Sequence, residues 1–369
     1  MHNDLNTQSV LSMKSSGYYS LKTIGAKIAI DNVYPLMLNS LENLPKNNNI
    51  YFADYGSADG GTSQEMWYML IKKLRQMNDY RQITILYTDL ASNDFSTLFK
   101  TMQGMNENVN FAYQKHFENV FVHGCGTGFH SQIMPSNTLS LGFSATAMHY
   151  VSQKPCQIKN HVHMVKSTNS EKLKFIKQAE EDWKKILTCR SKELKKGAKF
   201  ICLNFGIDEN GMYLGNTGGH SMFDKFNEHW QRLREKKVIS QDEYEKATFA
   251  QHYRTLEEFK KPFIDEKTIN NKLGLKLISC DTKLTKCPYR KDYEKNYKKM
   301  TNRDFARNLI PTMRSWSETV FRSALSSRSQ DMQNQIIETL YNNYENEIAE
   351  NPEGHAMDYI HIIMEIEKE

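Results

Sequence analysis

The chain has 369 residues and a formal net charge of +5, with 39% hydrophobic and 25% charged residues. This length exceeds one small core, so we expect a large α/β domain with an added helical part. We expect no secretory signal and no membrane span, because no apolar run approaches roughly 20 residues. The six cysteines form no CxxC pair, which favours reduced thiols and a cytoplasmic location. The basic stretch 283–299 contains interspersed acids, so a solvated face is favoured over a nucleic-acid site.

The expected elements alternate between strands and helices from residue 50 onward. The first strand, 50–53, leads into a glycine-rich turn and then into a helix over 65–77. A long helix over 170–194 precedes the last strand of this block. Alternation of this kind predicts an α/β fold with a doubly wound, mostly parallel sheet. The other expected strands are 83–90, 120–122, 139–143 and 199–204.

Two features at the ends of the first two strands indicate a nucleotide-type cofactor. Glycines 56, 60 and 61 allow the backbone to approach a ligand, although such turns also serve simply to pack a helix on a sheet. Asp89 ends the second strand, where a carboxylate accepts hydrogen bonds from a ribose diol. Its other role would be a helix cap, but Asn93 and Asp94 already supply one. Dinucleotide glycine spacing and a Gly-Lys-Ser/Thr motif are missing, which points to S-adenosylmethionine ahead of NAD or ATP.

The second half of the chain is predicted to be mainly helical. Aromatic and methionine residues mark 206–264, and a second helical group covers 302–344. An apolar strand over 359–366 is expected to return to the sheet. The chain is thus expected to divide into an N-terminal arm and helix closing the site (1–47), a cofactor-binding core (48–205), a helical cap and substrate-binding region (206–345) and a returning strand (346–369).

The most specific pattern lies between residues 121 and 155. It consists of a glycine-rich segment ending in Phe129, the run 134–139, and His149-Tyr150 followed by Pro155. In order and spacing these segments resemble the SABATH family of S-adenosylmethionine-dependent methyltransferases, the salicylate, benzoate, jasmonate and caffeine-pathway enzymes. The resemblance implies a Rossmann-like class I methyltransferase fold with a helical cap. Further matches, which extend it over most of the chain, lie at 53–56, 89–95, 181–182, 189–190, Arg314 and Glu318.

The resemblance also implies a cofactor site, with some departures from the family. Ser57 replaces a cysteine and Thr62 an asparagine, and both still offer hydrogen-bonding groups. Gly128 replaces a serine but keeps the backbone amide, and Phe129 is expected against the adenine face. The implied cofactor site comprises Tyr19, Asp54, Ser57, Thr62, Asp89, Leu90, Gly128 and Phe129.

His149 and Tyr150 correspond to the pair that holds the substrate carboxylate in that family. A phenolic O–H and an imidazole N–H supply two donors toward a carboxylate. Met222 is expected at the acceptor end, by counting back from residues 238–240, although methionines at helical spacing more often belong to a core.

One position in the N-terminal arm departs more seriously. The glutamine that helps to hold the substrate carboxylate in the family aligns with Ala26. Either another donor, such as Lys22 or Gln153, compensates, or the acceptor is not a simple aromatic acid.

The expected chemistry needs neither a catalytic side chain nor a metal. A carboxylic acid of pKa about 4 is ionised at neutral pH, so its oxygen attacks the methyl group directly once the two are aligned. The leading hypothesis is carboxyl O-methylation of a small acid to a methyl ester. A small-molecule N-methyltransferase and a non-catalytic cofactor-binding relative remain open. Members of the family often form homodimers, so the resemblance allows a homodimer here.

Overall fold

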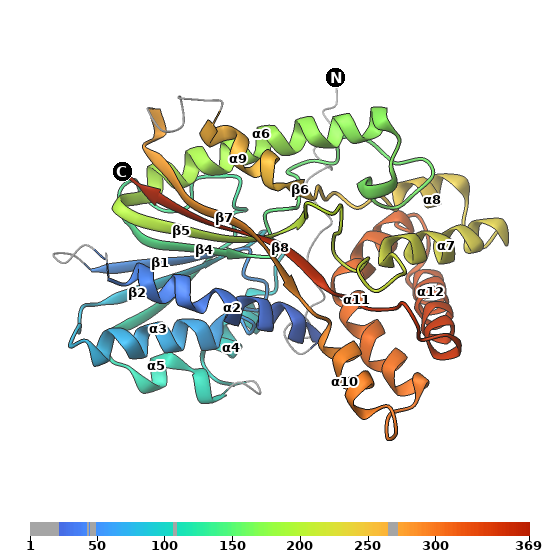
Figure 1. Cartoon of the computed structure of the whole chain (residues 1–369), viewed down its shortest axis with the longest axis horizontal. Coiled ribbons are helices and arrows are strands. Elements are labelled where there is room, and N and C mark those ends of the chain that lie inside the picture. The colour runs from blue at the N-terminus through green and yellow to red at the C-terminus, as the bar shows by residue number, and fades with distance from the viewer. Residues whose placement is uncertain (1–21, 43, 45–48, 106–108, 265–271) are drawn as a thin grey trace.

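The computed structural model describes residues 22–42, 44, 49–105, 109–264 and 272–369. One sheet runs through the molecule in the strand order β3-β2-β1-β4-β5-β8-β7, with the short strand β6 paired to β5 (Figure 1). The strands are β1 (Ile50–Tyr55), β2 (Ile83–Thr88), β3 (Val120–Cys125), β4 (Leu139–Ala145), β5 (Leu194–Ile207), β6 (Arg254–Thr255), β7 (Leu275–Thr285) and β8 (Tyr359–Lys368).

Strand direction confirms the predicted doubly wound sheet. The pairs β3-β2, β2-β1, β1-β4 and β4-β5 are all parallel, whereas β8 is antiparallel to both β5 and β7. The chain adds β2 and β3 on one side of β1 and then crosses to add β4 and β5 on the other. The strand order therefore reverses between β1 and β4, and sheets of this type bind ligands beyond the carboxyl ends of the strands at such a reversal.

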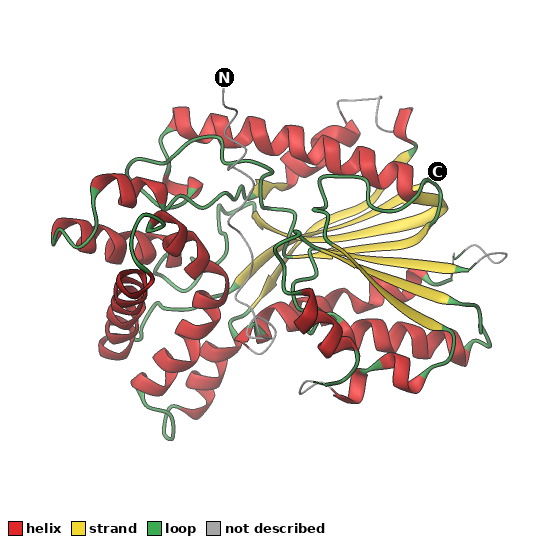
Figure 2. Cartoon of the chain, turned by 180° about the vertical axis from the view of Figure 1, so that it is seen from behind, coloured by secondary structure: helices red, strands yellow, loops and turns green. Residues whose placement is uncertain are grey.

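Helices cover both faces of the sheet (Figure 2). One face packs on α2, α3 and α4 through a core that includes Val33, Phe52 and Trp67. The opposite face packs on α6 and α9 through Trp183 and Phe259. These flanking helices are α2 (Ile24–Ser40), α3 (Gln64–Gln76), α4 (Phe95–Met102), α5 (Tyr113–His116), α6 (Asn169–Glu193) and α9 (Leu256–Ile264).

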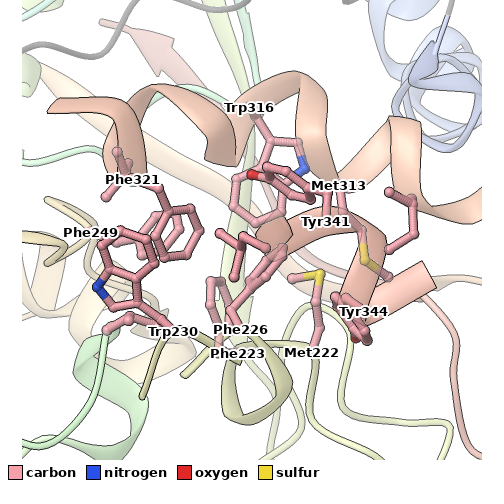
Figure 3. Close-up of a cluster of buried hydrophobic side chains, with 14 of the residues drawn as sticks. Met222, Phe223, Phe226, Trp230, Phe249, Met313, Trp316, Phe321, Tyr341 and Tyr344 are labelled. Carbon is pink, nitrogen blue, oxygen red and sulfur yellow. The ribbon is translucent and has the colours of Figure 1, made fainter. Parts of the chain in front are cut away.

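The remaining helices gather at one end of the sheet and form the cap (Figure 1). Their aromatic and methionine side chains share one hydrophobic cluster, which Figure 3 shows in close-up. Among the described residues, no helix is both long and apolar enough to cross a membrane. The cap helices are α7 (Met222–Glu235), α8 (Gln241–Lys246), α10 (Pro288–Asn296), α11 (Asn302–Ala324) and α12 (Gln330–Glu350).

Strand β7 is the main difference from the expected elements. It lies inside 206–345, which was predicted to be mainly helical, yet it pairs with β8 and belongs to the sheet. Buried positions are sparse along it, because β7 is the last strand of the sheet and is flanked on one side only. Lys276, Asp281 and Lys283 interrupt its apolar residues, so β7 lacks the continuous apolar run that is typical of a central strand.

Candidate functional site: two adjoining pockets

The carboxyl ends of four parallel strands meet at one pocket. Gly56 follows β1 with φ +76°, and a Cβ there would lie only 2.3 Å from the Cβ of Ala147 after β4. Glycine is therefore required for the two loops to approach this closely. Of the predicted cofactor residues, the structure brings Ser57, Thr62, Asp89, Leu90, Gly128 and Phe129 together in the walls of this pocket.

Asp89 connects the end of β2 to the glycine-rich turn. Its Oδ2 accepts a hydrogen bond from the backbone N–H of Ala58 at 2.7 Å, and its Oδ1 accepts one from that of Leu90 at 2.7 Å. Burial raises the pKa of Asp89, and these two amides counteract the effect. Because a carboxylate has about four lone-pair positions, it can still accept bonds from two ribose hydroxyls. The alternative role is already filled, since Asp94 caps α4 by accepting from the N–H of Thr97.

Asp54 lies beneath the pocket and is absent from the described lining residues. Its Oδ2 accepts hydrogen bonds from Ser63 Oγ at 2.6 Å and from Trp67 Nε1 at 2.9 Å, which ties β1 to the helix α3. Burial raises the pKa of Asp54 to about 6, and the nearby charge of Asp89 adds to the shift. A direct contact between Asp54 and a cofactor still rests on the resemblance alone.

The charge of this pocket fits a cofactor that has a ribose and no pyrophosphate. Asp89 is the one formally charged side chain at neutral pH among the lining residues that the structure describes, because burial lowers the pKa of His130 to about 4. A pyrophosphate is normally held by cations and helix N-terminal amides. The negative charge of Asp89 in this pocket would instead repel the phosphates. S-adenosylmethionine presents a ribose diol and a sulfonium cation, and both are complementary to a carboxylate.

A buried ion pair holds the loop that carries Phe129. Arg190 on α6 donates to the carbonyl oxygens of Phe129 at 2.9 Å and Ser131 at 2.8 Å. Its guanidinium also pairs with Glu193 at 2.7 Å, and Glu193 in turn accepts from the backbone N–H of Ile133 at 2.5 Å. The ion pair, both of whose side chains are fully buried, therefore fixes one wall of the pocket. Sequence reasoning noted Arg190 only as a family match and missed this role.

A second, narrow cavity adjoins the first and lies between the sheet and the cap. Thr146 and Tyr150 line both spaces, so the two meet at the loop after β4. Thr146 has φ +53°, an unfavourable conformation for a β-branched residue, and its N–H donates to the carbonyl oxygen of Leu203 at 2.7 Å. Strain of this kind clusters at functional sites, because the surrounding structure must hold the residue in place. We call the second space the acceptor cavity.

The acceptor cavity combines apolar walls with neutral polar groups. Phe205, Leu214 and Met357 supply apolar surface, whereas His149, Gln251 and Trp316 supply polar atoms. Burial lowers the pKa of His149 well below its usual value, and the neighbouring His361 and Arg254 lower it further. His149 is therefore neutral at pH 7, and none of the described lining residues carries a formal charge.

His149 and Tyr150 are the pair predicted to hold the substrate carboxylate. Both line the acceptor cavity, and their rings lie 4.5 Å apart, centroid to centroid. His149 Nδ1 is buried and has no hydrogen-bond partner within the part of the chain that the structure describes. A ligand oxygen or N–H could therefore be its partner, depending on the tautomer of the ring.

The structure separates other predicted residues from the acceptor cavity. Met222 belongs to the hydrophobic cluster of the cap, where Figure 3 shows it among aromatic rings, and it is absent from the described linings of both pockets. Ala26 does line the acceptor cavity, as the resemblance implies. The structure does not place Lys22 or Gln153 among the described residues of the cavity wall, because the side chains of Lys22 and Gln153 are both exposed and the amide of Gln153 donates to Gln178. Tyr19 lies outside the described residues.

Comparison with known proteins identifies the class. The solved structure of loganic acid methyltransferase with SAH has a TM-score of 0.73 to this chain, and the alignment covers 97% of this chain and 99% of that one. At 16% identity this likeness shows the fold, that of a Rossmann-like class I methyltransferase.

The family follows from the sequence model of the SAM-dependent carboxyl methyltransferases, which matches residues 22–369. The chain belongs to this family, which confirms the resemblance seen in the motifs and S-adenosylmethionine as the cofactor. A benzoic acid/salicylic acid carboxyl methyltransferase from Petunia hybrida is 27% identical over 143 residues, 37% of this chain and 40% of that protein. The farnesoic acid carboxyl-O-methyltransferase of Arabidopsis thaliana is 22% identical over 236 residues, 60% of this chain and 64% of that protein. The chain thus spans less than half the length of the first curated relatives it matches.

Proposed function

We propose that this protein transfers the methyl group of S-adenosylmethionine to the carboxylate of a small, largely apolar acid and releases the methyl ester. The observation that carries the proposal is the junction of the two pockets at Thr146 and Tyr150. One pocket has the carboxylate and glycine turn that suit a ribose, and the other has apolar walls with neutral donors. The curated relatives from Petunia and Arabidopsis are themselves named for carboxyl methylation, which supports the same chemistry.

The side chains in this proposal bind and align and do not exchange protons with the substrate. S-adenosylmethionine supplies an electrophilic methyl group on a sulfonium. The acid is already ionised at neutral pH, so no base is needed, and a neutral His149 of low pKa would be a poor one. Tyr150 and His149 would instead donate hydrogen bonds to the carboxylate and hold one oxygen in line with the methyl carbon. The apolar walls exclude water and strengthen these bonds.

The acceptor cavity favours an acid with a single charge. A second carboxylate or a phosphate would be buried without a cationic partner among the described lining residues, which is unfavourable. The single carboxylate, by contrast, lies beside the sulfonium charge of the cofactor at the junction of the pockets. Monocarboxylic acids with an apolar body are therefore the proposed substrate class.

A combined binding and product screen tests the proposal. The protein is mixed with S-adenosylmethionine and a panel of small carboxylic acids, with xanthines included as nitrogen acceptors, and products are detected by mass spectrometry. We expect a methyl ester from at least one acid and a thermal shift with the same acid. Methylated xanthines without esters would establish the N-methyltransferase alternative. Tight binding of S-adenosylmethionine without any product would establish a non-catalytic relative.

Two finer features are part of the proposal. All six cysteines are free thiols, in keeping with a reducing compartment, and we propose a cytoplasmic location. The homodimer that the resemblance allows can be tested by light scattering on the purified chain.

A further inference from the structure

Trp316 lines the acceptor cavity and carries a buried indole N–H that has no partner among the described residues. The side chain comes from α11, is 7% exposed and lines the cavity. Its Nε1 is buried and has no hydrogen-bond partner among the residues that the structure describes. Buried indole N–H groups normally have a hydrogen-bond partner, so the unpaired N–H of Trp316 needs an explanation.

The other tryptophans of the chain follow that rule. Trp67 donates to Asp54 at 2.9 Å, Trp183 to the carbonyl oxygen of Phe259 at 3.2 Å, and Trp230 to that of Tyr244 at 3.3 Å. Of the four tryptophans, all within the described part of the chain, Trp316 is the one that has an unpaired N–H and also lines a cavity. A ligand in the cavity is therefore the natural source of its partner.

The position of Trp316 separates it from the reacting carboxylate. Its ring packs on the cap, with its centroid 6.0 Å from that of Phe223 and 5.9 Å from that of Phe249. Figure 3 shows Trp316 within the cap cluster, and it is not among the described residues lining the cofactor pocket. Tyr150, in contrast, lines both spaces, and His149 packs on Phe205 of β5 on the sheet side. The carboxylate must lie where the pockets meet, so the partner of Trp316 is a different group.

We propose that Trp316 binds a second, neutral hydrogen-bond acceptor of the substrate. The substrate is then a small monocarboxylic acid that carries a hydroxyl, ether or carbonyl oxygen away from its carboxylate. A neutral group is required because no described lining residue offers a formal charge. This inference rests on the proposed function and narrows its substrate class.

The test compares matched acids in the wild type and in Trp316→Phe, which removes the N–H and keeps an aromatic ring. The probes are benzoic acid and its three monohydroxy isomers, together with cinnamic acid and its hydroxylated counterparts. We expect the wild type to prefer at least one hydroxylated acid over its parent by about tenfold or more in kcat/KM, because the parent acid leaves the buried indole N–H unpaired. Trp316→Phe should reduce that preference to within about threefold. The corresponding methoxy acid, where it fits, should retain the preference because its oxygen still accepts.

Trp230→Phe is the matched control. It removes a buried indole N–H from the same hydrophobic cluster but not from the described cavity wall, so the preference should be unchanged. A measurement on the wild-type protein avoids any folding defect of the variants. In nitrogen-15 spectra recorded with S-adenosylhomocysteine, the indole resonance of Trp316 should move downfield with the preferred hydroxylated acid and stay in place with its parent.

Several results would overturn the inference. An equal loss for hydroxylated and parent acids in Trp316→Phe would show that Trp316 contacts the carboxylate or only shapes the cavity. If the wild type methylates the parent acids with the same kcat/KM as the hydroxylated ones, the inference about Trp316 fails while the proposed function stands. If the wild type esterifies no acid at all, the proposed function fails, and this inference fails with it.

Discussion

Asp89 is the residue from which we expect the largest effect on the cofactor. Asp89→Ala releases the amides of Ala58 and Leu90 and removes the two charge-assisted hydrogen bonds that we propose between this carboxylate and the ribose. The dissociation constant for S-adenosylhomocysteine, measured by calorimetry, should rise roughly a hundredfold, or about 3 kcal/mol. Asp94→Ala is the control, because it removes a helix cap worth about 1 kcal/mol of stability and leaves the pocket intact. Equal affinity in the wild type and Asp89→Ala would show that the carboxylate serves only the turn.

Tyr150 allows a test of substrate binding with a single-atom change. Tyr150→Phe keeps the ring and removes the donor, so KM for the acid should rise about tenfold or more, while the affinity for S-adenosylhomocysteine alone is retained. His149→Ala should act in the same direction, with a further loss from the vacated volume. Tyr213→Phe is a suitable control because its hydroxyl contacts Ser221 away from the described pocket walls. Turnover indifferent to Tyr150→Phe would place the acceptor elsewhere.

At the scale of elements, the link between α6 and the loop after β3 can be tested at Arg190. Arg190→Lys keeps the positive charge but cannot reach Phe129 O, Ser131 O and Glu193 together. We expect the dissociation constant of S-adenosylhomocysteine to rise about tenfold, with kcat much less affected once the cofactor saturates, because the reacting groups are not contacted. A variant that melts earlier yet binds the cofactor normally would limit the ion pair to a stabilising role.

Helix α7 provides a second test at this scale. Met222 packs against Gly215, where an added Cβ would lie 2.8 Å from the Met222 Cβ, and it is 1% exposed. Met222→Ala should lower the free energy of unfolding by about 2–5 kcal/mol, as for other buried methionines, with the acid preference unchanged. A changed preference with little loss of stability would instead support the role at the acceptor end that the sequence predicts.

The parts of the fold that the sequence predicts correctly are those with local signals. The strands β1, β2 and β4, the cap at Asp94 and the glycine turn each follow from a few adjacent residues, and they position most of the cofactor pocket. Strand β7 was missed because its burial depends on β8, which lies far along the chain. The roles of Trp316 and Gln251 in the acceptor cavity were missed for the same reason. Only the packed cap shows which polar atom in a buried cluster lacks a partner.

At the scale of the whole molecule, buried neutral histidines should make the fold sensitive to acid. Burial lowers the pKa of His361 to about 3 and those of His229 and His355 to about 4. In the unfolded chain a histidine has a pKa of about 6.5, so below that pH the unfolded state binds more protons and stability falls as pH decreases toward the folded values. At pH 5 a fully buried histidine such as His361 should lower the free energy of unfolding by about 2 kcal/mol. Asp54 has the opposite sign, since its raised pKa of about 6 restores some stability as pH falls below that value.

Urea denaturation at pH 7.5 and at pH 5.5 measures this net effect. The midpoint should be lower at the acidic pH, because several histidines outweigh Asp54 and Asp89, the two aspartates whose pKa values are raised by burial. His361→Phe, which preserves the stacking on Phe205 at 4.6 Å, should reduce the pH dependence by about one proton. An unchanged or higher midpoint at pH 5.5 would show that these histidines are protonated without unfolding.

The shared walls at Thr146 and Tyr150 have a thermodynamic consequence for the order of binding. The same two residues line both pockets. A ligand that orders them on binding to one pocket therefore also orders them for the ligand of the other pocket. Reciprocity then requires that the factor by which the cofactor tightens the acid equals the factor by which the acid tightens the cofactor. The demethylated cofactor and the acid should therefore also favour each other, so that a high concentration of acid traps the spent cofactor and slows turnover.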